Sequence, residues 1–432
     1  MKVRIALTVV GTAALLTSVA IASTGTAFVD FGSSSQTIRG FGGADAWMPQ
    51  MTSAEADALF GNGNNQQIGL SILRVRIDPA GSANWGTERS NGQAAQARGA
   101  VAIATPWTPP ASMKSNNNVV GGSLNTSSYG AFASYLESFV NFMQSGGVSL
   151  YAISMQNEPD ARVTYESCAW TGSQMDTWVA QNSSALTTRL IMPESESFDT
   201  GFSDPALNDP NAVGHISIVG GHLYVVPPSF YTNAKNKGKE VWQTEHYLTG
   251  SGISGALALA KEIHDSMTVA QYNAYIWWWV KDWPAENFSN GLIDSNNNVK
   301  PAGYAMAQYS KFIRPGYVRS NATYNPSTNV YVSGYKGNGH FVIVALNLGS
   351  SAVSQPFKIQ NATVSTFTPF QTSPSGNLVQ LGTVNASNER KLYIHSAWPE
   401  HHNVRALRCR DTKLGRIEFR PIQILDIPVP RV

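Results

Sequence analysis

From residue 40 to residue 316, short apolar runs alternate with longer segments whose apolar residues recur every three or four positions. The short runs have the length and composition of buried strands, at 40–46, 70–77, 99–106, 149–157, 189–194, 215–224, 240–246 and 273–280. Segments such as 128–145 and 253–268 have the spacing of helices that pack along one face. Eight strands alternating with helices predict an α/β fold, a parallel (β/α)8 or TIM barrel over residues 40–316.

The pattern changes after residue 316. Residues 317–395 contain short alternating runs, such as "VYVSGYKG" and "FVIVALNLG", separated by Gly, Asn and Pro. Alternation of this kind is typical of antiparallel strands. Residues 28–39 alternate in the same way, so we predict a side antiparallel β-domain, a β-sandwich, fused to both ends of the barrel. The Arg-rich residues 396–432 match neither pattern and are predicted to form an atypical basic tail.

The first 27 residues have the pattern of a secretory signal peptide. Lys2 and Arg4 precede an apolar run, and small residues follow, so cleavage is expected after Ala22 or Ala27. A membrane anchor is the alternative, but small residues interrupt the run and no polar stop-transfer flank follows it. We therefore expect a secreted, extracellular protein that has no membrane contact after cleavage.

Composition narrows the classes of partner. Of the 432 residues only 13% are charged and the net charge is +2, which gives no general attraction to nucleic acid. The two cysteines, Cys168 and Cys409, can form at most one bridge, and neither has the spacing of a metal site. The chain has no phosphate-binding loop, metal cluster or Ser-His-Asp spacing, and we expect it to use neither metal nor cofactor. We also expect a monomer.

Candidate catalytic residues stand where the predicted strands end, because chemistry in such barrels occurs at the carboxyl ends of the strands. In order, these ends carry Asp45 and Trp47, Arg74 and Arg76, Trp107, Asn157 and Glu158, Glu194, His222 and Tyr224, Glu245 and His246, and Trp277 to Trp279. Glu158 ends the fourth strand and Glu245 the seventh, roughly across the barrel mouth. Either glutamate alone could be a salt-bridged strand end, but two carboxylates facing a cleft are the working parts of glycoside hydrolysis.

Aromatic and amide side chains beside these glutamates suit a sugar. Flat aromatic rings stack on the C–H faces of sugar rings, and Trp47, Trp107 and Trp278 are placed for that role. At least one residue of the triplet 277–279 must lie in the core, because alternate strand residues point in opposite directions. Asn157 is expected to hold a sugar hydroxyl.

The charges around the two glutamates predict different roles. Arg74 lies on an otherwise apolar strand and needs a buried anion, for which Glu245 is the candidate. A neighbouring arginine lowers the pKa of a carboxyl group, which suits a nucleophile, and Tyr224 could donate to the same group. Glu158 has no cation nearby in sequence and is predicted to keep its proton as the acid. Glu194 and Glu196 are interpreted as cap or loop residues.

Several stretches together resemble glycoside hydrolase family 30, in its xylanase branch: "GFGGADAW" at 40–47, "LSILRVRID" at 70–78, "ATPWTPPASMKSN" at 104–116, "LYAISMQNEPD" at 150–160, "IVGGHLY" at 218–224 and "VWQTEHY" at 241–247. The resemblance covers about residues 28–395. It implies endo-hydrolysis of β-1,4-xylan with retention of configuration. It also implies Glu158 as acid/base, Glu245 as nucleophile, Asn157 as the amide before the acid, Arg74 and Tyr224 as nucleophile support, and Trp107 at a sugar subsite.

Two departures from that family leave questions open. Its bacterial glucuronoxylanases carry arginine just after the eighth strand, which clamps a glucuronic acid branch, whereas this chain reads "VKDWPAENFSNG" with Lys281 and Asp282. The family's closing strand is also not recognisable after residue 395. A related glycosidase acting on another β-glycan, such as a β-1,6-glucanase or glucosylceramidase, and a non-catalytic sugar-binding protein remain alternatives.

Overall fold

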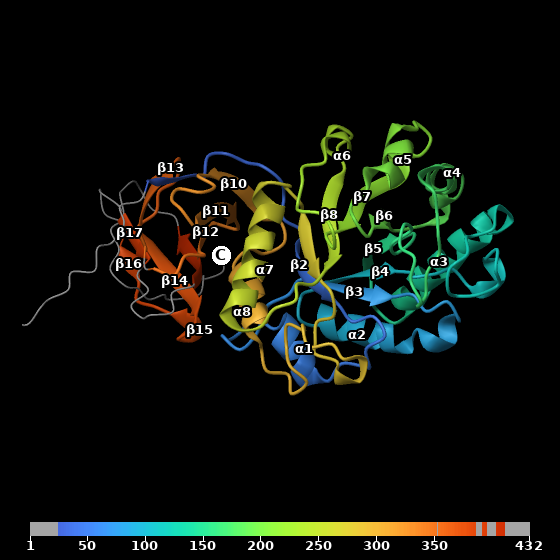
Figure 1. Cartoon of the computed structure of the whole chain (residues 1–432), viewed down its shortest axis with the longest axis horizontal. Helices are drawn as coiled ribbons and strands as arrows, with labels where there is room; N and C mark the ends of the chain where they lie inside the picture. Colours follow the sequence, from blue (N-terminus) through green and yellow to red (C-terminus); the bar gives the residue numbers. More distant parts are fainter. Residues whose placement is uncertain (1–24, 352, 386–390, 395–402, 411–432) are drawn as a thin grey trace, which may run out of the picture.

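The structure, a computed structural model, describes residues 25–351, 353–385, 391–394 and 403–410. Most of the predicted signal peptide and most of the predicted basic tail therefore lie outside the described residues. Figure 1 shows two parts side by side, a β-domain and a larger barrel, with helices α7 (Gly252–Thr268) and α8 (Pro301–Ser310) between them.

The predicted barrel is confirmed. Eight parallel strands close on themselves in chain order: β2 (Gly40–Ala44), β3 (Ile72–Arg76), β4 (Val101–Thr105), β5 (Leu150–Ser154), β6 (Arg189–Ser195), β7 (Ile216–His222), β8 (Glu240–His246) and β9 (Ala274–Trp277). Each of these strands lies within or overlaps one of the eight runs predicted from the sequence.

Helices follow the strands as the spacing predicts. They are α1 (Ser53–Phe60), α2 (Gly86–Gln96), α3 (Tyr129–Ser145), α4 (Gly172–Asn182), α5 (Asp204–Asn208), α6 (Thr232–Asn236), α7 and α8. In α3, Phe132, Leu136, Phe139 and Met143 are buried along one face, which confirms the predicted stripe. The side chain of Thr171 accepts a hydrogen bond from the backbone N–H of Gln174 and so begins α4 with a capping box.

The inside of the barrel has an apolar layer beneath a polar one. Near the middle of the strands the inward side chains form one buried cluster: Ile72, Ile103, Ala152, Ile191, Ile218, Trp242 and Ala274. Two residues further along several strands, on the same face, stand the buried polar residues Arg74, Thr105, Ser154 and Thr244. The apolar layer closes the barrel, so that the polar groups at the carboxyl ends of the strands are separated from those at the opposite end, such as Glu240.

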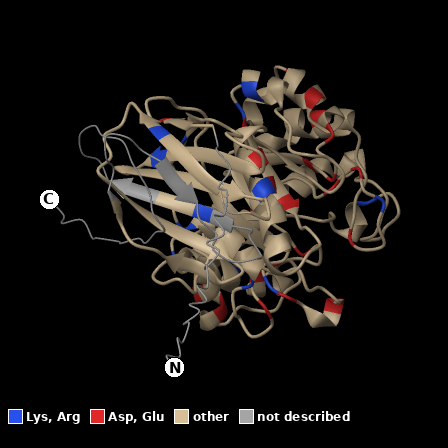
Figure 2. Ribbon diagram, turned by 60° about the vertical axis from the view of Figure 1, so that its left-hand side comes forward, with Lys and Arg blue, Asp and Glu red and all other residues tan. Residues whose placement is uncertain are grey.

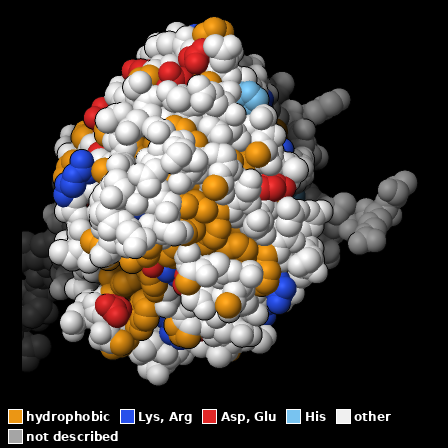
Figure 3. Space-filling model, turned by 90° about the vertical axis from the view of Figure 1, so that its right-hand side faces the viewer, with side chains coloured by type: hydrophobic (Ala, Val, Ile, Leu, Met, Phe, Trp, Pro, Cys, Tyr) orange, Lys and Arg blue, Asp and Glu red, His pale blue; other side chains and the backbone are white. Residues whose placement is uncertain are grey.

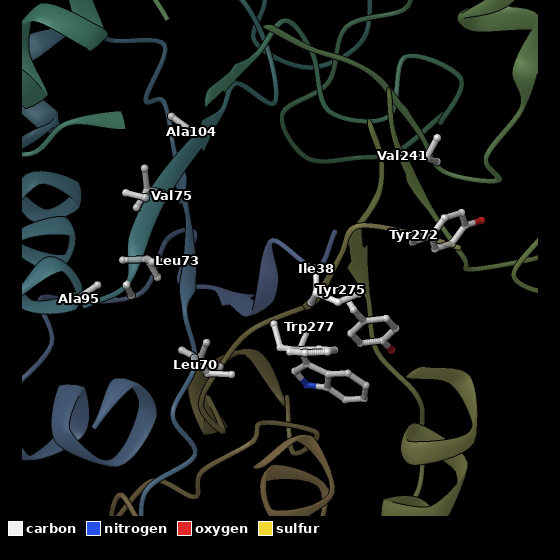
Figure 4. Close-up of a cluster of buried hydrophobic side chains, with 14 of the residues drawn as sticks. Ile38, Leu70, Leu73, Val75, Ala95, Ala104, Val241, Tyr272, Tyr275 and Trp277 are labelled. Carbon is white, nitrogen blue, oxygen red and sulfur yellow. The ribbon is translucent and has the colours of Figure 1, made fainter. Parts of the chain in front are cut away.

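Alternate strand residues point outward and build the main core. Leu73, Val75 and Ala104 lie in the cluster formed between strands and helices, and Leu73 points toward Ala95 of α2 (Figure 4). The same cluster holds Tyr275 and Trp277 of β9. The two-residue period of each strand thus separates the inner polar site from the outer apolar core.

The β-domain is a single curled sheet. It contains β1 (Ala27–Asp30), β10 (Val318–Ala322), β11 (Val330–Gly337), β12 (His340–Asn347), β13 (Val353–Gln360), β14 (Thr366–Ser373), β15 (Gly376–Gln380), β16 (Val384–Asn385), β17 (Lys391–Ile394) and β18 (Asn403–Arg410). As predicted, the segment before the barrel joins it, since β1 lies between β10 and β13. The pairing of β1 with β13 is parallel and the other pairings are antiparallel. Val29, Phe357 and Leu407 meet in the buried cluster of this domain.

The expectation that no strand of the β-domain lies beyond residue 395 is wrong for residues 403–410. They form β18, which pairs with β12 on one side and with β14 on the other. Gln308 of α8 then ties this strand to the barrel, because its side chain accepts from the backbone N–H of Ala406 at 3.0 Å and donates to Thr372 Oγ1 at 2.9 Å. The strand was not predicted because arginines at 405, 408 and 410 interrupt its apolar alternation and its partner strands are far away in the sequence.

Charged residues are sparse and of both signs, and Figure 2 shows them scattered over the ribbon rather than gathered on a basic face. None of the helices in the described part of the chain is long and apolar enough to cross a membrane. Cys168 is a buried free thiol.

Candidate active site

A cleft of about 690 Å³ opens at the carboxyl ends of the barrel strands. Aromatic and acidic side chains line it: Trp47, Trp107, Glu158, Tyr165, Glu196, Tyr224, Glu245, Tyr247, Trp278, Trp279, Trp283 and Glu286. Figure 3 shows hydrophobic side chains gathered in a band across the face of the barrel that lies away from the β-domain. No Lys or Arg stands among the described residues that line the cleft.

Glu245, near the end of β8, has the two supports predicted for it. Arg74 Nη1 donates to Glu245 Oε2 at 2.6 Å, and the Tyr224 hydroxyl donates to Oε1 at 2.8 Å. Arg74 is fully buried and also donates to Asn157 Oδ1 at 2.7 Å. Both oxygens of Glu245 are therefore held in fixed directions beside a cation.

The pKa of Glu245 does not follow the prediction. Burial raises it above the usual carboxyl value, and His222 and Arg74 offset that rise only in part. Arg74 acts in the predicted direction, but desolvation is the larger effect because only 5% of Glu245 is exposed. The hydrogen bonds from Arg74 and Tyr224 are thus needed to keep this buried group ionised.

Glu158, just beyond β5, does have a cationic partner, contrary to the prediction. His222 Nδ1 lies 2.8 Å from Glu158 Oε1, and the Tyr165 hydroxyl lies 3.5 Å from Oε2. Burial lowers the pKa of His222, but Glu245, Glu158 and Glu194 outweigh it and raise that pKa to about 10. His222 and Tyr165 thus each contact a different oxygen of Glu158. The contact with His222 could not be predicted from the sequence, because His222 and Glu158 are 64 positions apart and come from strands that are separated by β6 in the barrel.

The two glutamates converge. One carboxylate oxygen of Glu158, one of Glu245 and a ring nitrogen of His222 all lie within 4.8 Å of one another. Within the described residues, these three side chains form the one group whose donor atoms are close enough to hold a metal ion. The Arg74 guanidinium beside Glu245 opposes a cation there, so the geometry favours acid–base chemistry.

Strained backbone marks the same strand ends. Trp47, Glu158 and Glu194 have φ values of 60°, 43° and 55°, in the left-handed region that non-glycine residues rarely adopt. Each such residue costs about 1–3 kcal/mol, and such strain gathers at functional sites. The backbone N–H of Glu158 donates to the carbonyl of Glu194 at 2.9 Å, which holds two of these residues together.

The three tryptophans predicted to face a sugar do line the cleft. Their rings form a triangle: Trp107 lies 4.9 Å from Trp47 and 5.7 Å from Trp278 between centroids, and Trp47 lies 6.3 Å from Trp278. Arg74 lies over the Trp107 ring at 4.7 Å. Trp277 is buried in the core, as the alternation of strand residues requires. Asn157 was predicted to hold a sugar hydroxyl, but it is buried and does not line the cleft, and its side-chain oxygen instead accepts a hydrogen bond from Arg74.

The sequence analysis did not predict the part of the cleft formed by the loop after β9, which contributes Trp279, Trp283 and Glu286. Trp283 pairs with Phe288 by two backbone hydrogen bonds of 2.9 and 3.1 Å, and this turn presents Trp283 and Glu286 to the cleft. Trp279 contacts both rings, at 5.0 and 5.1 Å between centroids. The aromatic run "WWWVKDW" was the available signal, but which of its rings face outward depends on how the loop folds back.

Lys281, in the segment where the resemblance suggested a clamp, points elsewhere. Its ammonium group lies 3.1 Å from Glu55 Oε2, and Asp282 is paired with Lys300 at 2.6 Å. Both charges of this segment are thus used within the fold, and neither residue lines the cleft.

Beneath Trp47, Asp45 is fully buried, with one oxygen accepting from Asn91 at 2.7 Å. Burial raises the pKa of Asp45 to about 7. The unfolded chain releases this proton near pH 4 and the folded chain only near pH 7, so stability falls as pH rises between these values. We expect Asp45→Asn to remove this loss, about 4 kcal/mol at most.

The measurement is the free energy of unfolding in urea at pH 4.5, 6 and 8 for both proteins. The mutant curve should be flatter. The pKa of Glu88 is raised by burial and by the charge of Asp45, and the mutant removes the second of these effects, so the difference between the two curves includes the response of Glu88. Parallel curves would show that Asp45 ionises in the folded protein as it does in the unfolded chain.

Comparisons with known proteins agree with this site. No protein-family model matches the chain. Glucuronoxylanase XynC of Bacillus subtilis is 39% identical over 383 residues, which is 85% of this chain and 88% of the relative. The crystal structure of Xyn30A from Clostridium acetobutylicum, a glycoside hydrolase family 30 subfamily 8 xylanase, is 42% identical with a TM-score of 0.82, and the match covers 89% of this chain and 99% of that one.

A family 30 endoxylanase from Clostridium papyrosolvens C71 is 36% identical with a TM-score of 0.80, over 89% of this chain and 100% of that one. These relatives match both the barrel and the β-domain, and sequence identities of 36–42% over most of the chain show shared family membership as well as a shared fold. The chain therefore belongs to glycoside hydrolase family 30, in the branch of that family's xylanases.

Proposed function

We propose that this chain is a retaining endo-β-1,4-xylanase in which Glu245 is the nucleophile and Glu158 the acid/base. The observation that carries the proposal is the approach of a Glu158 oxygen and a Glu245 oxygen to within 4.8 Å on the floor of an aromatic cleft. Retaining enzymes hold these groups about 5–5.5 Å apart, whereas inverting enzymes need about 6.5–9.5 Å to admit a water molecule. Trp47 and Trp278, which are half-buried, offer faces for xylose rings, and Trp107, 2% exposed, packs against both at the edge of the cleft.

The residues divide the reaction into two displacements. A Glu245 oxygen attacks the anomeric carbon while Glu158 gives its proton to the departing glycosidic oxygen, and a xylosyl-enzyme forms. Glu158, now ionised, takes a proton from water, and the resulting hydroxide displaces Glu245 from the sugar. Tyr224 and Arg74 stabilise Glu245 as the ionised leaving group of the second step, which regenerates both carboxyl groups in their starting forms.

Product analysis tests the assignment. We expect reducing ends to appear on β-1,4-xylan, and proton NMR of the first product should show the β-anomer. Hydrolysis of β-1,6-glucan instead would identify another glycosidase of the family, and binding of xylan without hydrolysis would identify a sugar-binding protein. An α-anomer formed first would contradict the double displacement.

We further propose that the xylan need not carry glucuronic acid. Support comes from the charge of the cleft, where Glu158, Glu196, Glu245 and Glu286 face the substrate without a lysine or arginine among the described lining residues. Lys281 is engaged by Glu55. An anionic branch would therefore meet carboxylates rather than a cation, and this cleft suits a neutral chain better.

Glu286→Arg tests this preference. Glu286 is exposed at the rim, so reversing its charge is expected to raise kcat/KM on glucuronoxylan about five- to ten-fold relative to unbranched xylohexaose. Glu286→Gln should give an intermediate ratio. The measurement is the ratio of the two kcat/KM values for each protein at low salt. A wild-type enzyme that cleaves glucuronoxylan but not xylohexaose would contradict the proposal.

Secretion is also proposed, on the signal-peptide pattern of residues 1–27. Cleavage after Ala22 suits the fold better than cleavage after Ala27, because Ala27 is the buried first residue of β1. Mass spectrometry of the N-terminus of exported protein distinguishes the two sites.

A further inference from the structure

Glu194 of β6 is a fully buried carboxylate behind the two reacting groups, and it does not line the cleft. Thr105 Oγ1 donates to its Oε2 at 3.0 Å. Its Oε1 lies 3.3 Å from Arg74 Nη2 and 4.0 Å from His222 Nε2. A buried glutamate is costly unless it compensates neighbouring charges, and two cations stand beside this one.

Those two cations are the partners of the two reacting carboxylates. Arg74 contacts Glu245 at 2.6 Å, and His222 contacts Glu158 at 2.8 Å. Glu194 lies between the cations on the side away from the cleft, and its backbone carbonyl accepts from the N–H of Glu158. The contacts therefore run from Glu245 through Arg74, Glu194 and His222 to Glu158.

We propose that Glu194 is a positioning residue for the reaction: its carboxylate holds Arg74 and His222 in place and balances their charges, so that Glu245 is ionised while Glu158 carries the proton. The inference rests on the proposed double displacement. Glu194 touches neither the cleft nor the reacting atoms, so it acts through its two partners.

Charge balance in the cluster supports this role. Burial disfavours the charge of Glu194, but Arg74 and His222 outweigh it and lower its pKa to about 2. Arg74, from β3, and protonated His222, from β7, supply two positive charges. In the proposed reactive state, ionised Glu245, from β8, and Glu194 supply two negative charges and Glu158 carries the proton, while Thr105 and Ser154 contribute dipoles from β4 and β5. Without Glu194 the reactive state carries an excess positive charge, which favours early loss of the proton that the first step needs.

Glu194→Gln tests the charge with little change of shape. We expect kcat on xylan to fall roughly 100-fold with KM changed less than about three-fold, and the basic limb of the kcat/KM profile to move about one unit toward lower pH. Glu194→Asp keeps the charge, so its basic limb should return toward the wild-type position even if its shorter side chain leaves kcat low.

Glu88→Gln controls for replacing a buried glutamate by glutamine away from the reacting groups, without removing a charge beside Arg74 and His222. Glu88, in α2, is also buried with an oxygen that lacks a hydrogen-bond partner, but it has no contact with the reacting groups. It should leave kcat and the pH profile near wild type. Melting temperatures of all variants show whether each is folded.

Two results would overturn the inference. One is a folded Glu194→Gln variant with wild-type kcat and pH profile. The other is an equal loss of kcat in the Gln and Asp variants with an unmoved basic limb, which would make Glu194 merely structural. Failure of the proposed function would appear in the wild-type protein, as hydrolysis of a glycoside other than xylan. The wild type and the two Glu194 variants would then be compared on that glycoside. A wild-type protein inactive on every glycoside would contradict both proposals.

Discussion

Replacing Glu245 with glutamine is expected to lower kcat on xylan by at least about 10⁴-fold while the protein stays folded. An amide cannot attack the anomeric carbon, so no xylosyl-enzyme forms. The fold should tolerate the change, because Arg74 keeps Asn157 and Glu194 as partners after one contact is weakened. The measurement is steady-state release of reducing sugar, together with the melting temperature.

Glu240→Gln on the same strand is the control. Glu240 begins β8, at the end of the barrel opposite the cleft, and binds Arg39 at 2.7 Å. This variant should keep wild-type kcat. In the wild-type enzyme, mass spectrometry after treatment with a 2-fluoro-xylobioside that carries a good leaving group should locate the sugar on a peptide containing Glu245. Label on another residue, or a Glu245→Gln activity within ten-fold of wild type, would refute the nucleophile assignment.

Replacing Glu158 with alanine should have the second largest effect, a fall in kcat on xylan of about 10²–10⁴-fold. The xylan oxygen is a poor leaving group and needs the proton of Glu158. The leaving group of an aryl xyloside with an acidic phenol departs as a phenolate and does not need that proton. The first displacement on this substrate should therefore slow much less in the variant. Comparing pre-steady-state rates on the two substrates measures the difference.

Azide gives an independent readout for Glu158. In the alanine variant a small anion can enter the vacated space and attack the xylosyl-enzyme without a general base, so β-xylosyl azide should form and turnover of the aryl xyloside should rise. The wild-type enzyme should show no such rise. Equal losses on both substrates, with no azide product, would mean that Glu158 supports the site in another way.

The contrast between Glu158 and Glu245 shows what can be read from a linear chain. Their convergence was predicted from their positions at the ends of two apolar runs, because the carboxyl ends of parallel barrel strands meet at one rim whatever lies between them. The same reasoning placed Arg74 and Tyr224 beside Glu245, and the structure bears out both contacts. The β-domain strands before and after the barrel were also recognisable from their alternation.

Glu194 and His222 show what could not be read. Both were seen as strand-end residues, but their contacts join β3, β4, β6 and β7 and the residue beyond β5 through side chains that meet in the barrel interior. The predicted lowering of the pKa of Glu245 was wrong for a related reason, because burial raises that pKa. How fully the neighbours cover the group cannot be read from spacing in the sequence. The strand at Asn403–Arg410 likewise exists through its pairing with β12 and β14.

The eight-stranded barrel, the fused β-domain and the meeting of Glu158 with Glu245 could be predicted from the amino-acid sequence, because strand periodicity and strand ends are local properties that the fold then repeats in a regular way. Only the tertiary structure decided which groups lie beside each glutamate, which rings of the 277–283 segment face the cleft and that the cleft is lined by carboxylates without a cation among the described residues. Those features arise where loops and inward side chains from distant strands meet, and the free energy of a charge at such a place depends on its surroundings in three dimensions.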